Sequence, residues 1–271
     1  MTPNILLFLG IIVLLSLVAK MIYRFNFKKE AREVLSNSEH ASEKRFSYDQ
    51  LEGLPKPVQR YFKHVLSENQ PYINTIRLKH IGQFKTGLKK NWVDIRGQQY
   101  YNTQIPSFIW YGKIGAICAK DMYIKGKGKL IITLFYLFTI RKAQGRNYDQ
   151  GELLRWLGES VWFPTNLLPS DHLQWHAIDE TSAKLTLTYN KLSLFYIVTF
   201  NEKDQISKLE TKRYYEDNTL KTWVGECFKY KEINDVKVPT VLKASWIINK
   251  TEHNYALFQL EEIEYNKKEV Y

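Results

Sequence analysis

One segment of the sequence, GELLRWLGESVWFPTNLLP at residues 151–169, combines charged and aromatic residues at helical spacing. Arg155 and Glu159 are four residues apart, so a helix would bring them together on one side, one turn apart. Such a pair either holds a catalytic acid beside a cation or forms an ion pair on a solvent-facing surface. The two alternatives differ in whether the charged side of the helix is buried.

A helix over residues 150–162 is predicted here, with Asp149 as its amino-terminal cap and Pro164 near its end. At 100° per residue its large apolar side chains gather on one side: Leu153, Leu154, Trp156, Leu157 and Val161. Its charged side chains, Glu152, Arg155 and Glu159, fall opposite. An exposed ion pair contributes only about 0.2–0.5 kcal/mol, whereas a fully buried large side chain contributes roughly 1.5–3 kcal/mol. We therefore expect a packing helix that acts as a lid, with Trp156 reaching the interior.

Other candidate motifs are incomplete. His172 and His176 are four residues apart, but the glutamate of a helical zinc-protease motif is missing. GKGK at 126–129 lacks the Lys-Ser/Thr pair of a phosphate-binding loop, and the sequence has no nucleophile elbow or dinucleotide fingerprint. Cys118 and Cys227 have no metal-ligand spacing. We predict no catalytic residue, no metal site and no cofactor.

An apolar run, LIITLFYLFTI at residues 130–140, is bracketed by basic residues. These are Lys125, Lys127, Lys129, Arg141, Lys142 and Arg146, with no acidic residue among them. Eleven apolar residues are too few to cross a bilayer as a helix. The run fits three alternatives: a buried strand with solvated ends, the lining of a cavity, or a segment that rests on anionic lipid.

The amino-terminal segment predicts a membrane anchor. Residues 5–19 are uncharged, and the apolar stretch extends to Tyr23, which is long enough for a transmembrane helix over residues 1–24. A cleaved signal peptide is the alternative, but the start lacks a basic residue and LVA is a poor cleavage site. Basic residues follow the helix at 20, 24, 28, 29 and 32, so the folded domain is expected in the cytoplasm. There, Cys118 and Cys227 should be free thiols.

The rest of the chain predicts one β-rich domain over residues 55–271, after a juxtamembrane connector at 25–54. A short amphipathic helix is predicted at 56–66, with Pro55 and Pro57 in its first turn. From Ile73 the hydrophobic period changes to two, and ten or eleven strands follow. The fold class is mainly β (α+β), a strongly curved antiparallel sheet or half-open barrel with a covering helix. The aromatic content of 14% agrees with a sheet.

The sequence resembles an uncharacterised bacterial family. The similarity covers most of residues 50–265 and rests on LPKPVQRYFKHVL, GKGK, GELLRWLGESVWFPTNLLP and KYKEINDVKVPTVLKASW, in that order. The resemblance implies an apolar amino-terminal segment followed by one β-rich domain, and it implies no activity. A weaker resemblance, at the level of the fold, is to lipoprotein carriers of the LolA kind, in which helices close the apolar mouth of a curved sheet. Those carriers are periplasmic, whereas the basic residues here predict a cytoplasmic domain.

We therefore predict a membrane-anchored binding protein for a lipid or another apolar small molecule, held inside the curved sheet. The residues expected to contact the ligand are Trp156, Leu157, Trp162, Arg155, Glu159 and Trp246. The alternatives are an enzyme that acts on an apolar substrate and a scaffold with a filled barrel. The net charge of +11 suits anionic lipid headgroups. The expected partner is the lipid bilayer, and we do not expect a nucleic-acid partner.

Overall fold

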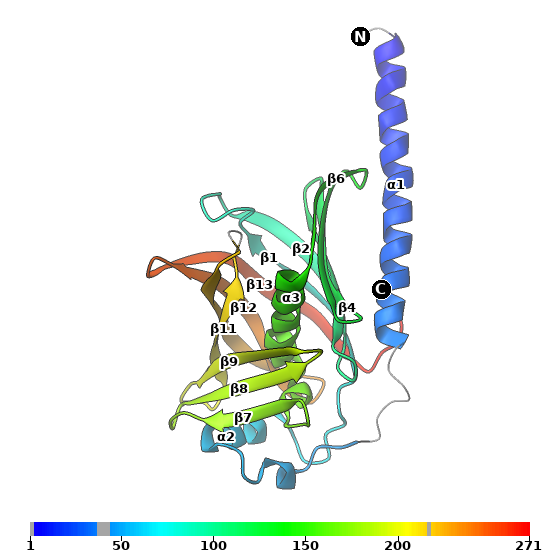
Figure 1. Ribbon diagram of the computed structural model, residues 1–271. Coiled ribbons are helices and arrows are strands. Elements are labelled where there is room, and N and C mark those ends of the chain that lie inside the picture. Colours follow the sequence, from blue (N-terminus) through cyan, green and yellow to red (C-terminus); the bar gives the residue numbers. More distant parts are fainter. Residues whose placement is uncertain (1–2, 37–43, 216–217) are drawn as a thin grey trace.

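A computed structural model describes residues 3–36, 44–215 and 218–271. Thirteen strands form one antiparallel sheet, in the order β6-β5-β4-β3-β2-β1-β13-β12-β11-β10-β9-β8-β7. The sheet is strongly curved and does not close, and a helix covers its concave face (Figure 1). The predicted fold class is confirmed.

The strands form two runs of consecutive hairpins. The first run contains β1 (Thr75–Phe84), β2 (Val93–Asn102), β3 (Ser107–Ile114), β4 (Ile117–Ile124), β5 (Lys127–Leu134) and β6 (Phe138–Gln144). The second contains β7 (Leu173–Ala177), β8 (Ser182–Tyr189), β9 (Leu192–Phe200), β10 (Ile206–Tyr214), β11 (Leu220–Ile233), β12 (Val236–Ile248) and β13 (Thr251–Tyr265). The two runs join where β1 pairs with β13, so the first and last strands lie side by side.

The strand count exceeds the prediction chiefly because the apolar run at 130–140 is not one strand. It contains the end of β5, a turn at residues 135–137 and the start of β6. Hairpin turns usually contain Asn and Gly, which tolerate positive φ. Here Phe135 and Tyr136 have φ values of 52° and 64°. The sequence therefore carries no turn signal at this hairpin.

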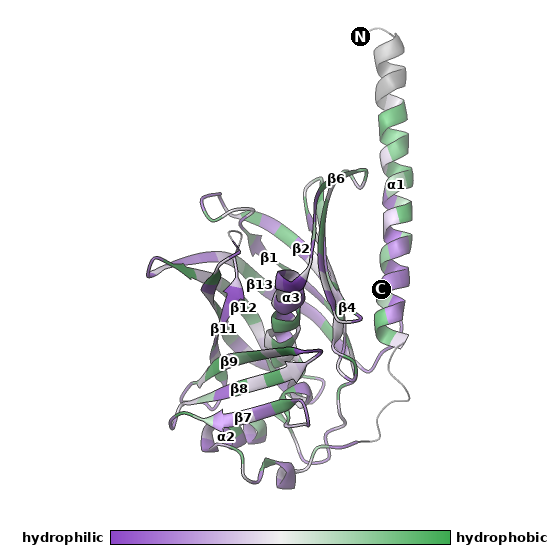
Figure 2. Ribbon diagram, viewed as in Figure 1, coloured by the Kyte–Doolittle hydropathy of each residue, from purple (hydrophilic) through white to green (hydrophobic). Residues whose placement is uncertain are grey.

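The helix α1 (Pro3–Ser36) is continuous through the predicted anchor and into the predicted connector. Its carboxyl-terminal part packs against the convex side of the sheet, where Phe27, Ala31, Val34 and Leu35 form a cluster with Tyr100 and Ile109. Lys120 Nζ and Glu30 Oε2 form an ion pair of 2.6 Å across this contact. Residues 10–19 of α1 project beyond the sheet and are apolar (Figures 1 and 2). From Gly10 to Ser36 the helix is long and apolar enough to cross a membrane, a criterion that a signal sequence also satisfies.

Two helical regions fill the concave side of the sheet. The predicted helix at 56–66 is present as α2 (Lys56–Val65), which follows the short helix η1 (Tyr48–Leu51) and buries Val58, Tyr61, Phe62 and Val65. The connection between the two runs of strands is α3 (Arg146–Glu159), followed by the short helices η2 (Ser160–Trp162) and η3 (Pro164–Leu167). Figure 1 shows α3 between the two arms of the sheet.

The amino-terminal end of α3 differs from the prediction. The helix begins at Arg146, and Gly145, with φ of 114°, occupies the cap position. Asp149 is inside the helix, where its carboxylate accepts a hydrogen bond of 2.8 Å from the backbone N–H of Gly128. Asp149 was a poor guide to the helix start because its partner is a strand that the local sequence does not identify.

Candidate functional site

A cavity of about 530 Å³ lies between α3 and the concave face of the sheet. Volumes of about 300–1,000 Å³ are usual for pockets that hold small molecules. The two arms of the sheet supply apolar walls, which include Ile95, Ala119, Ile132, Leu209, Leu242 and Phe258. The side of α3 that faces the cavity carries Gly151, Glu152, Arg155, Gly158 and Glu159. The cavity therefore has apolar walls and one charged side.

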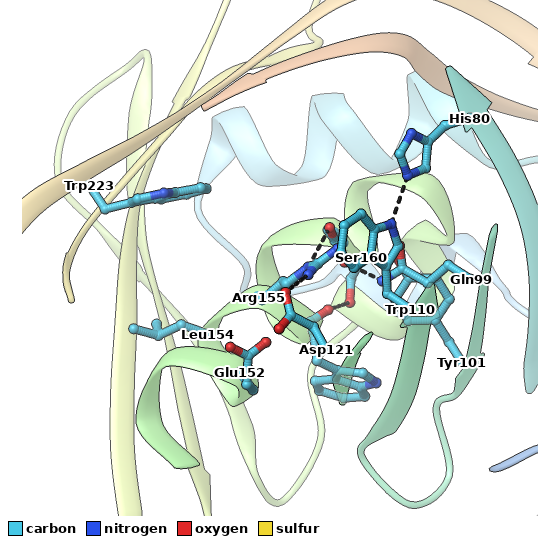
Figure 3. A network of polar contacts seen from close by, with 12 residues as sticks. His80, Gln99, Tyr101, Trp110, Asp121, Glu152, Leu154, Arg155, Ser160 and Trp223 are labelled. Carbon is cyan, nitrogen blue, oxygen red and sulfur yellow. Dashed lines mark hydrogen bonds and ion pairs between the residues drawn. The ribbon is translucent and has the colours of Figure 1, made fainter. Parts of the chain in front are cut away.

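The charged side is a network centred on Arg155. Its guanidinium donates to Asp121 Oδ2 at 2.8 Å and to Glu159 Oε1 at 3.0 Å. The second oxygen of Glu159 accepts hydrogen bonds from Gln99 Nε2 at 2.7 Å and from Tyr101 Oη at 2.8 Å. Figure 3 shows Arg155 pointing from α3 toward Asp121 on β4. The two carboxylates come from different elements, so the network ties α3 to the sheet.

Aromatic rings lie close to Arg155. Its guanidinium carbon is 5.2 Å from the ring centre of Phe108 and 4.9 Å from that of Trp110, distances typical of cation–π contacts. Trp110 Nε1 donates to His80 Nε2 at 2.8 Å. Burial, with a contribution from the Arg155 charge, lowers the pKa of His80 to about 3. His80 is therefore neutral at pH 7 and serves as a hydrogen-bond acceptor.

A second contact between an arginine and a carboxyl group lies beside the first. Arg213 Nη2 is 3.5 Å from Glu152 Oε1, and the other carboxyl oxygen of Glu152 is buried without a hydrogen-bond partner. Burial, followed by the charge of nearby Asp121, raises the pKa of Glu152 to about 8. Asp121 also has one buried oxygen without a partner. The raised pKa favours the protonated form of Glu152 at pH 7.

A glycine in α3 lies directly against Arg213. A Cβ atom at Gly151 would be 3.0 Å from Nε of Arg213. Such a separation is tighter than van der Waals contact, so a side chain at this position would displace the guanidinium. The absence of a side chain lets Arg213, which comes from β10, lie against the helix and reach Glu152.

Three of the six residues expected to contact a ligand line the cavity: Arg155, Glu159 and Trp246. The other three pack elsewhere in the protein core. Trp156 Nε1 donates to the carbonyl of Asn102 at 3.0 Å, Trp162 Nε1 donates to the carbonyl of Pro239 at 3.0 Å, and Leu157 is fully buried. Ligand contact by any of the six stays a prediction.

The amphipathic pattern placed Glu152, Arg155 and Glu159 opposite the packing side of the helix, while Arg155 and Glu159 were also expected to contact a ligand. Their side chains are 5%, 13% and 14% exposed, so the charged side does not lie on the solvent-facing surface. The charged side faces the cavity, while Trp156 and Leu157 pack in the main hydrophobic core. The reason is that the sheet surrounds α3 on several sides, so neither side of the helix is left in water. Helical periodicity separates the two sides but does not say which one faces solvent.

Asp121, Glu152, Arg213 and His80 were not predicted as site residues. Asp121 follows Lys120 in β4 and Arg213 follows Lys212 in β10, so neither residue stood out from the other charged residues of its strand. Glu152 fell on the side of the helix opposite its packing side. His80 in β1 had no neighbouring residue in the sequence that pointed to chemistry.

The remaining sequence candidates lie away from the cavity. His172 precedes β7, His176 lies within it, and both are exposed. Among the residues that the structure describes, no group of three or more His, Cys, Asp and Glu side chains could hold a metal ion. Cys118 and Cys227 are free and buried. Cys227 lines the cavity, and burial raises the pKa of its thiol well above the ordinary value.

Comparison with known proteins gave matches of two kinds, and no protein of curated function matches the sequence. Among solved structures, a domain described as an outer membrane lipoprotein-sorting protein from Vibrio parahaemolyticus aligns with a TM-score of 0.42 and 9% identity, over 78% of this chain and 91% of that one. A LolA superfamily protein from Nitrosomonas europaea aligns with a TM-score of 0.43 and 9% identity, over 79% and 94%. The pattern of a family of unknown function, DUF6544, matches residues 44–258. This match spans nearly the whole domain after α1, and the chain therefore belongs to that family.

Proposed function

We propose that this protein binds a lipid or another apolar ligand in the cavity between α3 and the sheet while α1 holds it at a membrane. The observation that carries the proposal is the cavity of about 530 Å³ with apolar walls. An apolar pocket with a few convergent polar groups is the usual form of a small-molecule site. A scaffold with a filled barrel would have no such space.

The charged side of the cavity supports an amphiphilic ligand rather than a hydrocarbon. One oxygen of Glu152 and one of Asp121 are buried without partners. A buried polar atom without a hydrogen bond costs about 1–3 kcal/mol, so a ligand group that bonds to it is favoured. A hydroxyl or amino group on the ligand would match the Asp121 oxygen, and a carbonyl or hydroxyl would accept from protonated Glu152.

The test first looks for a molecule bound in the cavity and then fills the cavity with a larger side chain. The full chain is purified in mild detergent and analysed by native mass spectrometry, followed by solvent extraction of the bound material. Ala119→Trp, on the cavity wall, should remove the bound molecule. Ala177→Trp, at an exposed position of β7, should not remove it. Thermal unfolding of both variants verifies that they are folded. If the unsubstituted protein carries no apolar molecule and takes up no fluorescent fatty acid, the proposal is wrong.

One observation favours a second candidate, an enzyme that acts on an apolar substrate. Glu152 has a pKa of about 8 and lines the cavity, and carboxyl groups with such raised pKa values act as general acids in enzymes. Glu152→Gln keeps the size and a hydrogen-bond donor but removes the acidic proton. An enzyme would lose turnover of ester or amide lipid analogues in this variant and still bind them. A binding protein would show no turnover before or after the substitution.

A further inference from the structure

The cavity extends to the end of the sheet from which the apolar half of α1 projects. The tip of the β5–β6 hairpin and the loop between β1 and β2 lie at this end, and the amino-terminal end of α3 points toward it (Figure 1). The cavity lining includes Leu88 from the β1–β2 loop, Ile140 from β6, and Tyr148 from α3. If α1 crosses a membrane, this end of the molecule faces the bilayer surface.

The tip of the β5–β6 hairpin exposes a cluster of large apolar side chains. Phe135 is 50% exposed, Phe138 64% and Ile140 57%. Isolated exposed apolar residues are ordinary on a protein surface, but a contiguous group marks a site of interaction with a protein or a membrane. This group lies within six consecutive residues of one hairpin.

The turn at this tip is made of residues that do not favour it. Phe135 and Tyr136 both have positive φ, a conformation in which bulky residues are outliers. Among the residues that the structure describes, the other tight turns of the sheet with two consecutive residues at positive φ are Lys125–Gly126, Asn190–Lys191, Asn234–Asp235 and Asn249–Lys250. Each of these contains Asn or Gly, as hairpin turns of this type require. The local preferences of the turn therefore do not account for two aromatic residues at the β5–β6 turn.

The hairpin tip is level with the end of the apolar segment of α1. The ring centres of Tyr136 and Tyr23 are 5.4 Å apart, and Tyr136 Oη is 3.1 Å from Tyr111 Oη. Tyr23 lies between Lys20 and Arg24, the first two basic residues of α1. Tyrosine is enriched at the headgroup level of membranes. The contact therefore places the hairpin tip at the membrane–water interface of a bilayer crossed by α1.

The same end of the molecule carries basic residues. Arg141 and Lys142 follow the tip in β6 and are exposed. The β1–β2 loop, residues 85–92, contains Lys85, Lys89 and Lys90 without an acidic residue, and the Lys85 ammonium lies 4.9 Å from the ring centre of Trp92. Asp94 follows two residues later, in β2. Lysine and arginine next to a membrane anchor attract anionic lipid headgroups.

We propose that this end of the molecule docks on the bilayer that α1 crosses, with the β5–β6 tip in the headgroup region and the β1–β2 loop against anionic lipid. The cavity then opens onto the membrane surface, and an amphiphile enters it from the adjacent leaflet. The position of the bilayer depends on α1 being the anchor, as in the proposed function. It does not depend on what the cavity binds.

The first experiment measures docking directly. A single cysteine is introduced by Phe138→Cys in the full chain, labelled with an environment-sensitive fluorophore and reconstituted in vesicles of phosphatidylcholine with phosphatidylglycerol. The control is Ile178→Cys, which is 50% exposed and lies between β7 and β8 at the other end of the molecule (Figure 1). The native cysteines are buried, and the unsubstituted protein gives the labelling background.

Lipids that carry a spin label at the headgroup should quench the probe at 138 several-fold more strongly than the probe at 178. Equal quenching at the two positions would overturn the proposal. The quenching measurement requires no ligand. Quenching can therefore be absent while native mass spectrometry finds a bound lipid, and quenching can be present while no bound lipid is found. The two proposals can therefore be rejected separately.

A second variant separates docking from folding. Phe135→Asn with Phe138→Ser gives the first turn position a residue that favours positive φ and removes the two exposed aromatic side chains, while Tyr136 keeps its contacts with Tyr23 and Tyr111. We expect the thermal midpoint to stay the same or rise, while a probe at Asn91→Cys in the β1–β2 loop loses most of its quenching. A lowered midpoint with unchanged quenching at 91 would show that the aromatic tip has only a structural role, and would overturn the proposal.

Discussion

At the scale of single residues, the decisive feature is a set of buried charges that compensate one another. Arg155 is shared between Asp121 and Glu159, and Arg213 lies beside Glu152. Buried ion pairs contribute little net stability, because the loss of hydration offsets most of their attraction. Removing one partner of a buried ion pair is strongly destabilising, because the remaining charge is left without a partner. The network therefore fixes the position of α3 more than it stabilises the fold.

Arg155→Met should destabilise the protein by about 3–5 kcal/mol, because it leaves Asp121 and Glu159 buried without their cation. The matched control is Arg60→Met, which removes the exposed pair that Arg60 forms with Asp204 and should cost about 0–1 kcal/mol. Denaturant unfolding of both variants in the same detergent gives the comparison. Equal losses of unfolding free energy in the two variants would show that water reaches the Arg155 network in solution.

The raised pKa of Glu152 predicts a dependence of stability on pH. Its pKa is about 8 in the folded protein and 4.5 as the ordinary value, so between these pH values the folded state binds a proton that the unfolded chain has lost. The contribution of Glu152 is therefore fully present below pH 4.5 and is lost as the pH rises through 8, with a slope of at most about 1.4 kcal/mol per pH unit.

The variant Glu152→Gln isolates this effect. His80, with its lowered pKa, contributes stability that instead rises with pH between about 3 and 6.5, so the wild type alone mixes the two slopes. The unfolding free energy of the wild type minus that of Glu152→Gln should decrease steadily from pH 5 to pH 8. The wild type is therefore favoured most at pH 5. Glu210→Gln, at an exposed position, should show no such trend.

At the scale of elements, α3 is the helix that joins the two arms of the sheet. It connects the two runs of strands, and it contacts strands from both arms of the sheet. Its glycines are explained by close neighbours rather than by flexibility. A Cβ atom at Gly158 would be 2.8 Å from Oη of Tyr196, which itself donates to the carbonyl of Leu154 at 3.0 Å.

Gly158→Ala should therefore destabilise the protein by about 1–3 kcal/mol, although alanine favours a helix by about 1 kcal/mol over glycine. Tyr196→Phe removes the hydroxyl that the new methyl group would meet. The double variant should be more stable than the sum of the two single effects predicts, as measured in a double-mutant cycle. Strict additivity would mean that the hydroxyl is not what excludes a side chain at position 158.

At the scale of the whole molecule, the arrangement of α1 relative to the sheet decides where the cavity opens. The carboxyl-terminal part of α1 is fixed to the convex side by apolar contacts and by ion pairs of Lys120 with Glu30 and Lys125 with Glu33. The carboxyl terminus of the chain is also held there, since the backbone N–H of Tyr271 donates to Tyr100 Oη at 3.0 Å. The anchor and the domain are thus joined along a surface.

We expect the full chain to resist carbonate extraction and its carboxyl terminus to be cytoplasmic, because basic residues follow the apolar part of α1 and none precedes it. A reporter fused after Tyr271 that is active only in the cytoplasm gives the measurement. The same fusion on a chain that begins after Ser36 gives the control for the reporter itself. Activity only outside the cytoplasm would reverse the proposed orientation.

Local sequence was sufficient for several features of this protein. The two-residue period predicted an antiparallel sheet, Pro57 and the spacing of Val58, Tyr61, Phe62 and Val65 predicted α2, and the uncharged run at residues 5–19 predicted an apolar helix. The recognised motifs also indicated an uncharacterised family. These features follow from the identity of neighbouring residues, because hydrophobic periodicity and helix propensity act over one or two turns of chain.

Only the tertiary structure decided which side of α3 faces the cavity. Arg155 and Glu159 have the spacing of an exposed ion pair, and their burial depends on Asp121, Gln99 and Tyr101, which lie 34 to 60 residues away in the sequence. Likewise, the pairing of β1 with β13 and the raised pKa of Glu152 arise from neighbours that only the folded chain brings together. The free energy of a charged side chain is set by its surroundings, and here those surroundings come from the whole sheet.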